Sequence, residues 1–74
     1  MKATINQKTA FEKTLKKIKN KELVKMNEVM LESGYSKATA VNPGKNLTSK
    51  PGWQLLLNRI DDREILNRFL ESIS

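Results

Sequence analysis

The sequence predicts a small all-α bundle of about five short helices, in a single domain that spans residues 1–74. Apolar residues recur at spacings of three and four along most of the chain, which is the period of an amphipathic helix. Both prolines and two of the three glycines lie between residues 43 and 52, so little length remains for paired strands. At 74 residues the chain is near the lower limit for an independent core, so most large apolar side chains must be buried.

Two helices are expected before Gly34. The first begins near Thr9, because Thr9 and Glu12 have the spacing of a capping box. The second begins after Asn20, whose side chain can accept a bond from the amides that follow it. The apolar sides consist of Phe11, Leu15 and Ile18 in the first helix and of Leu23, Met26, Val29 and Met30 in the second.

A helix-turn-helix is predicted at about residues 21–42. Gly34 can adopt the left-handed conformation that ends a helix, and Ser36 can cap the next helix by accepting a bond from an early amide. The next helix is short, roughly residues 36–42, because the ring of Pro43 disfavours helical backbone at Asn42. In this register the inward residues are Val29, Met30, Tyr35 and Ala40.

Two further helices are expected after a loop around residues 45 and 46. A capping hydroxyl from Thr48 or Ser49, with Pro51 in the first turn, predicts a helix that starts near residue 50. Asp61 and Glu64 have the spacing of another capping arrangement at the start of the last helix. The apolar sides consist of Trp53, Leu56, Leu57 and Ile60 in the fourth helix and of Ile65, Leu66, Phe69, Leu70 and Ile73 in the fifth.

The positive charge of the chain is concentrated before residue 51. The formal net charge is +6, and residues 1–50 contain eleven lysines and four glutamates, whereas residues 51–74 contain three arginines and four acidic residues. This charge favours an anionic partner such as nucleic acid, although a solvated lysine surface has the same composition. The basic part of the chain also contains the helix-turn-helix, whose second helix can enter a DNA major groove.

Several functional classes are excluded by composition. Cysteine and histidine are absent, so the chain has no disulfide framework, no thiol nucleophile and no Cys/His metal cluster. The longest strictly apolar run is residues 55–57, far short of the roughly 20 residues that span a bilayer, and no signal-peptide pattern follows the first lysine. We therefore expect no catalytic residues, no cofactor or metal, no membrane partner and a cytoplasmic location.

The polar residues left on the outer side of the motif have the chemistry of base and phosphate contacts. Lysine can bond guanine or phosphate, asparagine can pair with adenine, and serine or threonine can bond either kind of group. Lysines beside the motif are placed to contact phosphates that fix its register. The predicted DNA-contacting residues are Ser36, Lys37, Thr39 and Asn42, with Lys25, Lys45 and Lys50 outside the motif.

These motifs resemble the N-terminal helix-turn-helix domain of small terminase subunits from tailed phages and prophages. The resemblance covers roughly residues 23–60 and rests on a conjunction of motifs, namely Gly34-Tyr35-Ser36, Asn42-Pro43 and Lys50-Pro51-Gly52-Trp53. It implies a domain that recognises viral double-stranded DNA for packaging in a bacterial host cell and helps bring it to the large terminase subunit.

The same resemblance implies that Ser36, Lys37, Thr39 and Asn42 lie on the DNA-contacting helix. Family members also contain an oligomerisation region after this domain and usually act as rings. The helices at about residues 50–74 are then expected to lead into such a region, and the full-length protein to be a homo-oligomer. Either this chain is an excised domain, or the resemblance extends only to the DNA-binding module.

Other functions share parts of this pattern. A helix-turn-helix transcriptional regulator has the same motif, because fold does not fix function. A protein-interaction or assembly module is a second alternative, since the last helix has five large apolar residues within nine positions. Binding of a lipid surface by the lysine-rich first helix is a third, but its three apolar residues suit a protein core better.

Overall fold

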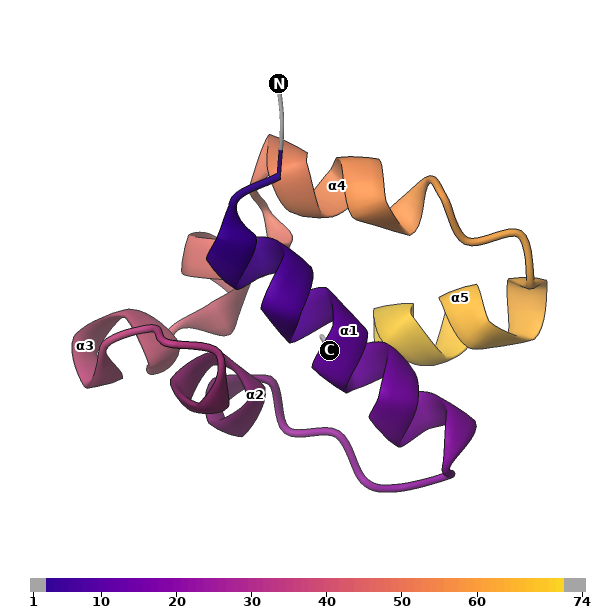
Figure 1. Ribbon diagram of the computed structural model, residues 1–74, viewed down its shortest axis with the longest axis horizontal. Helices are drawn as coiled ribbons and strands as arrows, with labels where there is room; N and C mark the ends of the chain where they lie inside the picture. Colours follow the sequence, from indigo (N-terminus) through magenta and orange to yellow (C-terminus); the bar gives the residue numbers. More distant parts are fainter. Residues whose placement is uncertain (1–2, 72–74) are drawn as a thin grey trace.

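The computed structural model describes residues 3–71, which form five α-helices and one π-helix with no strand among them (Figure 1). The elements are α1 (Ile5–Lys19), α2 (Met26–Glu32), α3 (Lys37–Ala40), the π-helix η1 (Gly44–Thr48), α4 (Pro51–Leu57) and α5 (Arg63–Glu71). The predicted all-α class is confirmed. Figure 1 shows α1 in the middle of the molecule, with α2 and α3 on one side and α5 on the other.

Helix α1 begins before the position predicted from the sequence. Thr4 is its N-cap: the Thr4 hydroxyl accepts a bond from the Gln7 backbone N–H at 3.1 Å, and Gln7 Oε1 accepts one from the Thr4 N–H at 2.8 Å. Thr9 lies inside the helix, where its hydroxyl donates to the carbonyl of Ile5 at 2.9 Å. The capping box expected at Thr9 and Glu12 is therefore wrong, because the Thr4–Gln7 pair supplies the same chemistry one turn earlier.

The end of α1 explains why Asn20 does not begin a second helix. Asn20 is the C-cap of α1, and Lys21 follows it with a left-handed φ of 58°. The Lys21 N–H donates to the Ile18 carbonyl at 3.1 Å, and the Glu22 N–H donates to the Lys17 carbonyl at 2.8 Å. These two bonds form a Schellman motif, which ends the helix and turns the chain away.

Helix α2 begins at Met26, later than expected. Lys25 occupies its N-cap without a side-chain hydrogen bond. Leu23 lies before the helix and is 79% exposed, so its expected place on the apolar side is wrong. Met26, Val29 and Met30 are buried as the spacing predicts.

The turn between α2 and α3 has the predicted chemistry. Gly34 has a φ of 98°, and the Tyr35 N–H donates to the Met30 carbonyl at 3.0 Å, which closes a second Schellman motif. Ser36 is the N-cap of α3, and its hydroxyl accepts a bond from the Thr39 N–H at 3.3 Å. The expected inward residues are also confirmed, since Val29, Met30 and Ala40 are buried and Tyr35 is half-buried.

The core is centred on three aromatic rings from three helices. Phe11 of α1 stacks on Phe69 of α5 with ring centroids 4.9 Å apart, and it meets Trp53 of α4 edge-on at 5.7 Å. Trp53 and Phe69 are fully buried. Trp53 is therefore a core residue, as predicted, and does not offer a surface for base stacking.

Helix α4 starts at Pro51, where the sequence places it, but without the expected hydroxyl cap. Its N-cap makes no side-chain hydrogen bond. The Thr48 hydroxyl donates to the Gly44 carbonyl at 3.2 Å, and the Ser49 hydroxyl donates to the Lys45 carbonyl at 2.8 Å. Both hydroxyls thus donate to carbonyl groups of the preceding π-helix and do not cap α4.

The first turn of α4 packs closely against the start of α1. A Cβ atom added at Gly52 would lie 3.0 Å from the Ala3 Cα atom and would clash with the Gln7 side chain. Only glycine allows this approach, because every other side chain begins with the missing atom.

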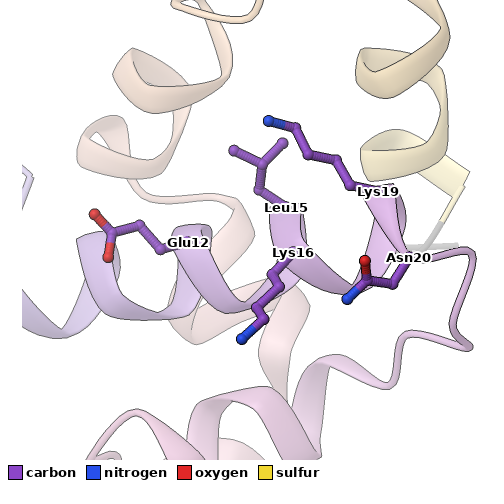
Figure 2. Close-up of a pocket in the computed structure, with 5 residues that line it drawn as sticks. All are labelled: Glu12, Leu15, Lys16, Lys19 and Asn20. Carbon is purple, nitrogen blue, oxygen red and sulfur yellow. The ribbon is translucent and has the colours of Figure 1, made fainter.

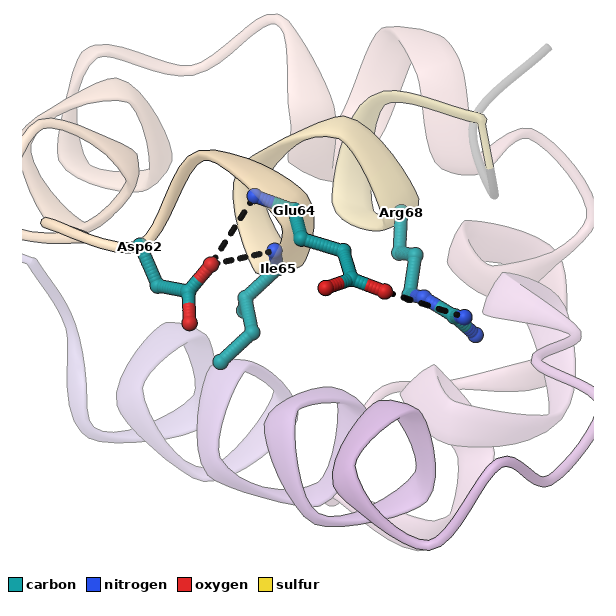
Figure 3. A network of polar contacts seen from close by, with 4 residues as sticks. All are labelled: Asp62, Glu64, Ile65 and Arg68. Atoms are coloured by element: carbon teal, nitrogen blue, oxygen red, sulfur yellow. Dashed lines mark hydrogen bonds and ion pairs between the residues drawn. The ribbon is translucent and has the colours of Figure 1, made fainter.

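Helix α5 is capped by Asp62 rather than by Asp61. Asp62 Oδ1 accepts bonds from the backbone N–H groups of Glu64 at 2.9 Å and Ile65 at 3.3 Å (Figure 3). The prediction is wrong by one residue. An exposed ion pair of 3.5 Å between Arg68 and Glu64 follows on the same helix.

The apolar side of α5 mostly closes the core. Phe69 is fully buried, and Ile65 and Leu66 pack against the core while partly exposed. Leu70 is 50% exposed, and Ile73 lies outside the described residues. Within residues 63–71, the surplus apolar surface expected for an interaction or assembly module is thus reduced to Leu70.

We predict that Gly34→Ala destabilises the fold. A φ of 98° is strained for any residue with a Cβ atom, and that atom would lie 3.4 Å from Asn6 Oδ1. The free energy of unfolding should fall by about 1–3 kcal/mol in urea denaturation.

Lys21→Gly provides the matched control, because Lys21 holds the equivalent position after α1 with a φ of 58°. This change removes the left-handed strain of a side chain and should raise the free energy of unfolding by up to about 1 kcal/mol. Equal effects of the two substitutions would contradict the role of backbone strain at Gly34.

Candidate nucleic-acid interface

Helix α3 and the π-helix η1 form one bent helical segment, residues 37–48, which we call the α3–η1 segment. Val41 follows α3 with φ −68° and ψ −18°, and Pro43 precedes η1 with φ −62° and ψ −34°. The Asn46 N–H donates to the Asn42 carbonyl at 3.0 Å across the junction. The helix predicted at residues 36–42 is therefore shorter, since α3 ends at Ala40. The loop predicted around residues 45 and 46 is wrong, because helical backbone resumes at Pro43 and continues as η1.

A side chain repairs the break that Pro43 makes. Proline has no N–H, so the carbonyl four residues earlier, that of Thr39, loses its usual donor. Asn46 Nδ2 donates to this carbonyl at 2.9 Å, closer than the Asn42 N–H at 3.4 Å, and Asn42 Oδ1 accepts a bond from the Lys45 N–H at 3.3 Å. Two asparagines thus join the two helical pieces on either side of the proline.

The inner side of the α3–η1 segment is fixed in the core. Ala40 and Leu47 are both buried, and Thr48 is buried beside Leu47. The wider π-turn is closed by the Ser49 N–H, which donates to the Gly44 carbonyl at 3.1 Å. Short π-helical turns are rare and often lie at functional sites.

The outer side of the segment faces solvent. Ser36, Lys37, Asn42 and Lys45 are exposed, whereas Thr39 is partly buried. Lys25 and Lys50, at the N-caps of α2 and α4, are also exposed. The structure thus brings most of the predicted DNA-contacting residues onto one continuous stretch of chain, seen in Figure 1 as α3 and the turns that lead to α4.

Lys25 lies apart from the rest of this set. It precedes the first residue of α2, whereas the turn and α3 follow the last one. A seven-residue helix is about 10 Å long, so this distance separates Lys25 from the turn. Lys25 is therefore placed beside the α3–η1 segment rather than on it.

The uncharged polar residues of the predicted site already have partners. The Ser36 hydroxyl donates to the Thr39 hydroxyl at 2.9 Å and accepts a bond from the Thr39 N–H. The amide oxygen of Asn42 caps Lys45. These side chains order the segment, and a base contact by any of them has to compete with an existing bond.

The four lysines of the predicted site have no such partners. Lys25, Lys37, Lys45 and Lys50 form no ion pair with a described residue. Lys25 and Lys50 are the N-caps of α2 and α4, where a cation is unfavourable to the helix dipole. Helix stability therefore does not account for these two lysines.

Two signals in the sequence mark this surface more sharply than the motif alone. No aspartate or glutamate occurs between Glu32 and Asp61, so the turn, the α3–η1 segment and α4 are free of acidic side chains. Lys37, Val41 and Lys45 follow one another at helical spacing, which identifies Val41 as an outer residue. An interpretation of the sequence that places every apolar residue in the core does not find Val41 on the surface.

Tyr35 lies in the turn, near the Thr4 side chain at the start of α1. Its ring is half-buried. Burial raises the pKa of the Tyr35 phenol, and the nearby Thr4 side chain opposes this shift in part. The tyrosine is therefore neutral at ordinary pH and acts as a packing residue of the turn.

A second basic surface lies on α1. Figure 2 shows Leu15 among Glu12, Lys16, Lys19 and Asn20, which line a groove of about 320 Å³. A neighbouring groove of about 410 Å³ is lined by Lys8, Phe11, Glu12, Leu15, Leu56 and Arg59. None of the predicted DNA-contacting residues lines either groove. The lysines of α1 thus belong to a separate surface and provide control positions for tests of the α3–η1 segment.

No protein-family model, curated protein or solved structure matches the chain. The resemblance to small terminase subunits therefore rests on the sequence motifs alone. Among residues 3–71, no helix is both long and apolar enough to cross a membrane, and no group of three or more acidic side chains is placed to hold a metal ion.

We predict that Asn46→Ala destabilises the α3–η1 segment through the Thr39 carbonyl. Losing the 2.9 Å bond should lower the free energy of unfolding by about 1 kcal/mol. In a Pro43→Ala background the new N–H at residue 43 can donate to the same carbonyl. Asn46→Ala should then lower the free energy of unfolding by less than it does in the wild-type chain. Denaturation of the two single variants and the double variant measures this coupling, and an equal cost in both backgrounds would contradict the repair.

Proposed function

We propose that this chain binds double-stranded DNA through the outer side of the α3–η1 segment, as a helix-turn-helix module. The observation that carries the proposal is a helical segment with its inner side fixed by Ala40 and Leu47 and its outer side bearing the unpaired Lys37 and Lys45. A DNA major groove is about 12 Å wide and admits one helix, and its phosphates attract cations at both edges.

The length of the segment fits this role. Lys37 and Lys45 lie on either side of Pro43 and are both exposed, so the outer side of the segment continues beyond the four residues of α3. A helix limited to α3 has only four residues and gives room for few contacts.

We further propose that the module belongs to a phage or prophage small terminase subunit acting in the cytoplasm of a bacterial host. Support comes from the resemblance of the Gly-Tyr-Ser turn, the Asn-Pro break and the Gly-Trp pair to that family. The structure gives each motif a physical role: Gly34 ends α2, Pro43 bends the segment, and Gly52 lets α4 approach α1. In this proposal the DNA is viral, and the large terminase subunit and further copies of the chain are the partners.

The proposal predicts a specific salt dependence. Three phosphate contacts, by Lys37, Lys45 and Lys50, give a slope of log affinity against log salt of about −3. Affinity for a labelled duplex should therefore fall about 40-fold between roughly 50 and 200 mM salt, measured by fluorescence anisotropy. Binding that does not depend on salt, or no binding at the lower salt concentration, would overturn the proposal.

The variant Lys37→Ala/Lys45→Ala should weaken binding and make the slope shallower by about 2, because two phosphate contacts are lost. The matched control is Lys16→Ala/Lys19→Ala, which removes the same charge from the exposed surface of α1. An equal loss in both variants would show attraction to net charge alone. In an NMR titration of the wild-type chain with duplex DNA, the largest shifts should fall on residues 36–50.

A further inference from the structure

Val41 is an apolar side chain placed on the outer side of the α3–η1 segment. It is 74% exposed, whereas its neighbour Ala40 is buried. Its N–H donates to the Lys37 carbonyl at 3.2 Å, so one helical turn separates it from Lys37, and Lys45 follows four residues later. Ala38, also exposed, lies on the preceding turn. Packing in the core therefore gives no reason for an apolar residue at this position.

Other apolar residues are equally exposed, but in different surroundings. Ile5 is 81% exposed at the start of α1, and Leu23 is 79% exposed in the loop before α2. Single exposed apolar residues are normal on protein surfaces. Val41 differs because it lies one helical turn after Lys37 and four residues before Lys45, two exposed lysines without ion pairs, in a stretch of chain without acidic residues.

Val41 lies between Lys37 and Lys45 in the chain, on the outer side of the α3–η1 segment. In the proposed complex the two lysines bind phosphates at the edges of the major groove, and the exposed Val41 side chain faces the base edges. The apolar group that base edges present in this groove is the C5 methyl of thymine. A contact with Val41 breaks no existing bond, unlike contacts of Ser36 or Asn42.

We propose that Val41, supported by Ala38, contacts a thymine methyl group and gives the chain a preference for duplex sites with thymine at one position. This inference rests on the proposed DNA binding and adds the base that the α3–η1 segment distinguishes. Val41 is a specificity-determining residue in this account, while the lysines supply affinity that does not depend on sequence.

The test removes single methyl groups from the DNA. Duplexes are first enriched from a random-sequence pool by the wild-type chain, and each thymidine of the enriched site is then replaced in turn by deoxyuridine. The replacement keeps base pairing and charge and removes only the C5 methyl. At one position it should weaken wild-type binding by about 3- to 5-fold, as expected for the burial of one methyl group.

In the variant Val41→Ser the same replacement should have no effect, because the apolar partner is gone. Leu23→Ser is the matched control, since Leu23 is as exposed as Val41 but lies outside the segment. It should retain the wild-type preference. Melting curves check that both variants fold, which is expected for such exposed side chains.

The remaining outcomes contradict either the role of Val41 or the proposed DNA binding. Salt-dependent binding without an enriched site, an enriched site without thymine, or deoxyuridine replacements that never weaken binding overturn the inference and leave the proposed DNA binding intact. Retention of the preference in Val41→Ser overturns the role of Val41. Absence of any duplex binding at low salt overturns the proposed function itself.

Discussion

The structure depends on the packing of α1 against α2, α4 and α5. Phe11 is central to it, because its ring contacts both Trp53 and Phe69 from helices that follow much later in the chain. The buried indole Nε1 of Trp53 has no hydrogen-bond partner among the described residues, which costs about 1–3 kcal/mol. Burying a side chain of this size removes roughly 150–250 Å² from water and contributes about 4–6 kcal/mol, so the apolar gain exceeds the polar loss. A small chain can therefore accept one unpaired polar atom in exchange for a large core residue.

The helix-turn-helix is positioned by the same central helix. Thr14 of α1 donates a hydrogen bond to the Met26 sulfur of α2 at 3.7 Å, and the half-buried Tyr35 in the turn packs against the core. Beyond the turn, the α3–η1 segment contacts the core through Ala40 and Leu47, while its outer side chains contribute little to burial. Stability and proposed DNA contact are thus assigned to opposite sides of one short segment, and outer residues can change without loss of the fold.

The parts of the fold that sequence predicts well are those decided by local chemistry. Gly34 and Ser36 are sufficient to place the turn, because left-handed backbone and an N-cap hydroxyl are properties of single residues. Cap positions are predicted poorly where two candidates lie close together: Asp61 and Asp62 differ by one residue, and only the path of the chain selects Asp62. The continuation of the helix beyond Pro43 could not be predicted, because the Thr39 carbonyl is bonded by the Asn46 side chain, seven residues away, in place of the missing N–H of Pro43. In the site, the exposed lysines follow from charge, whereas Val41 is missed because apolar residues are assigned to the core by default.

The bent segment also changes what a single copy of this domain can do. Helix α3 alone has four residues, whereas the α3–η1 segment continues past Pro43 to residue 48 and so offers more outer side chains to a major groove. Even so, about three phosphate contacts correspond to weak attachment, since non-specific binding at physiological salt has dissociation constants of about 10⁻⁴ to 10⁻⁶ M. One apolar base contact raises the affinity by a factor of less than ten. In the proposed DNA binding, tight and selective attachment therefore requires several linked copies, whose effective concentration multiplies a modest affinity per copy. An oligomer that presents many such segments to one DNA molecule satisfies this requirement without any change in the segment itself.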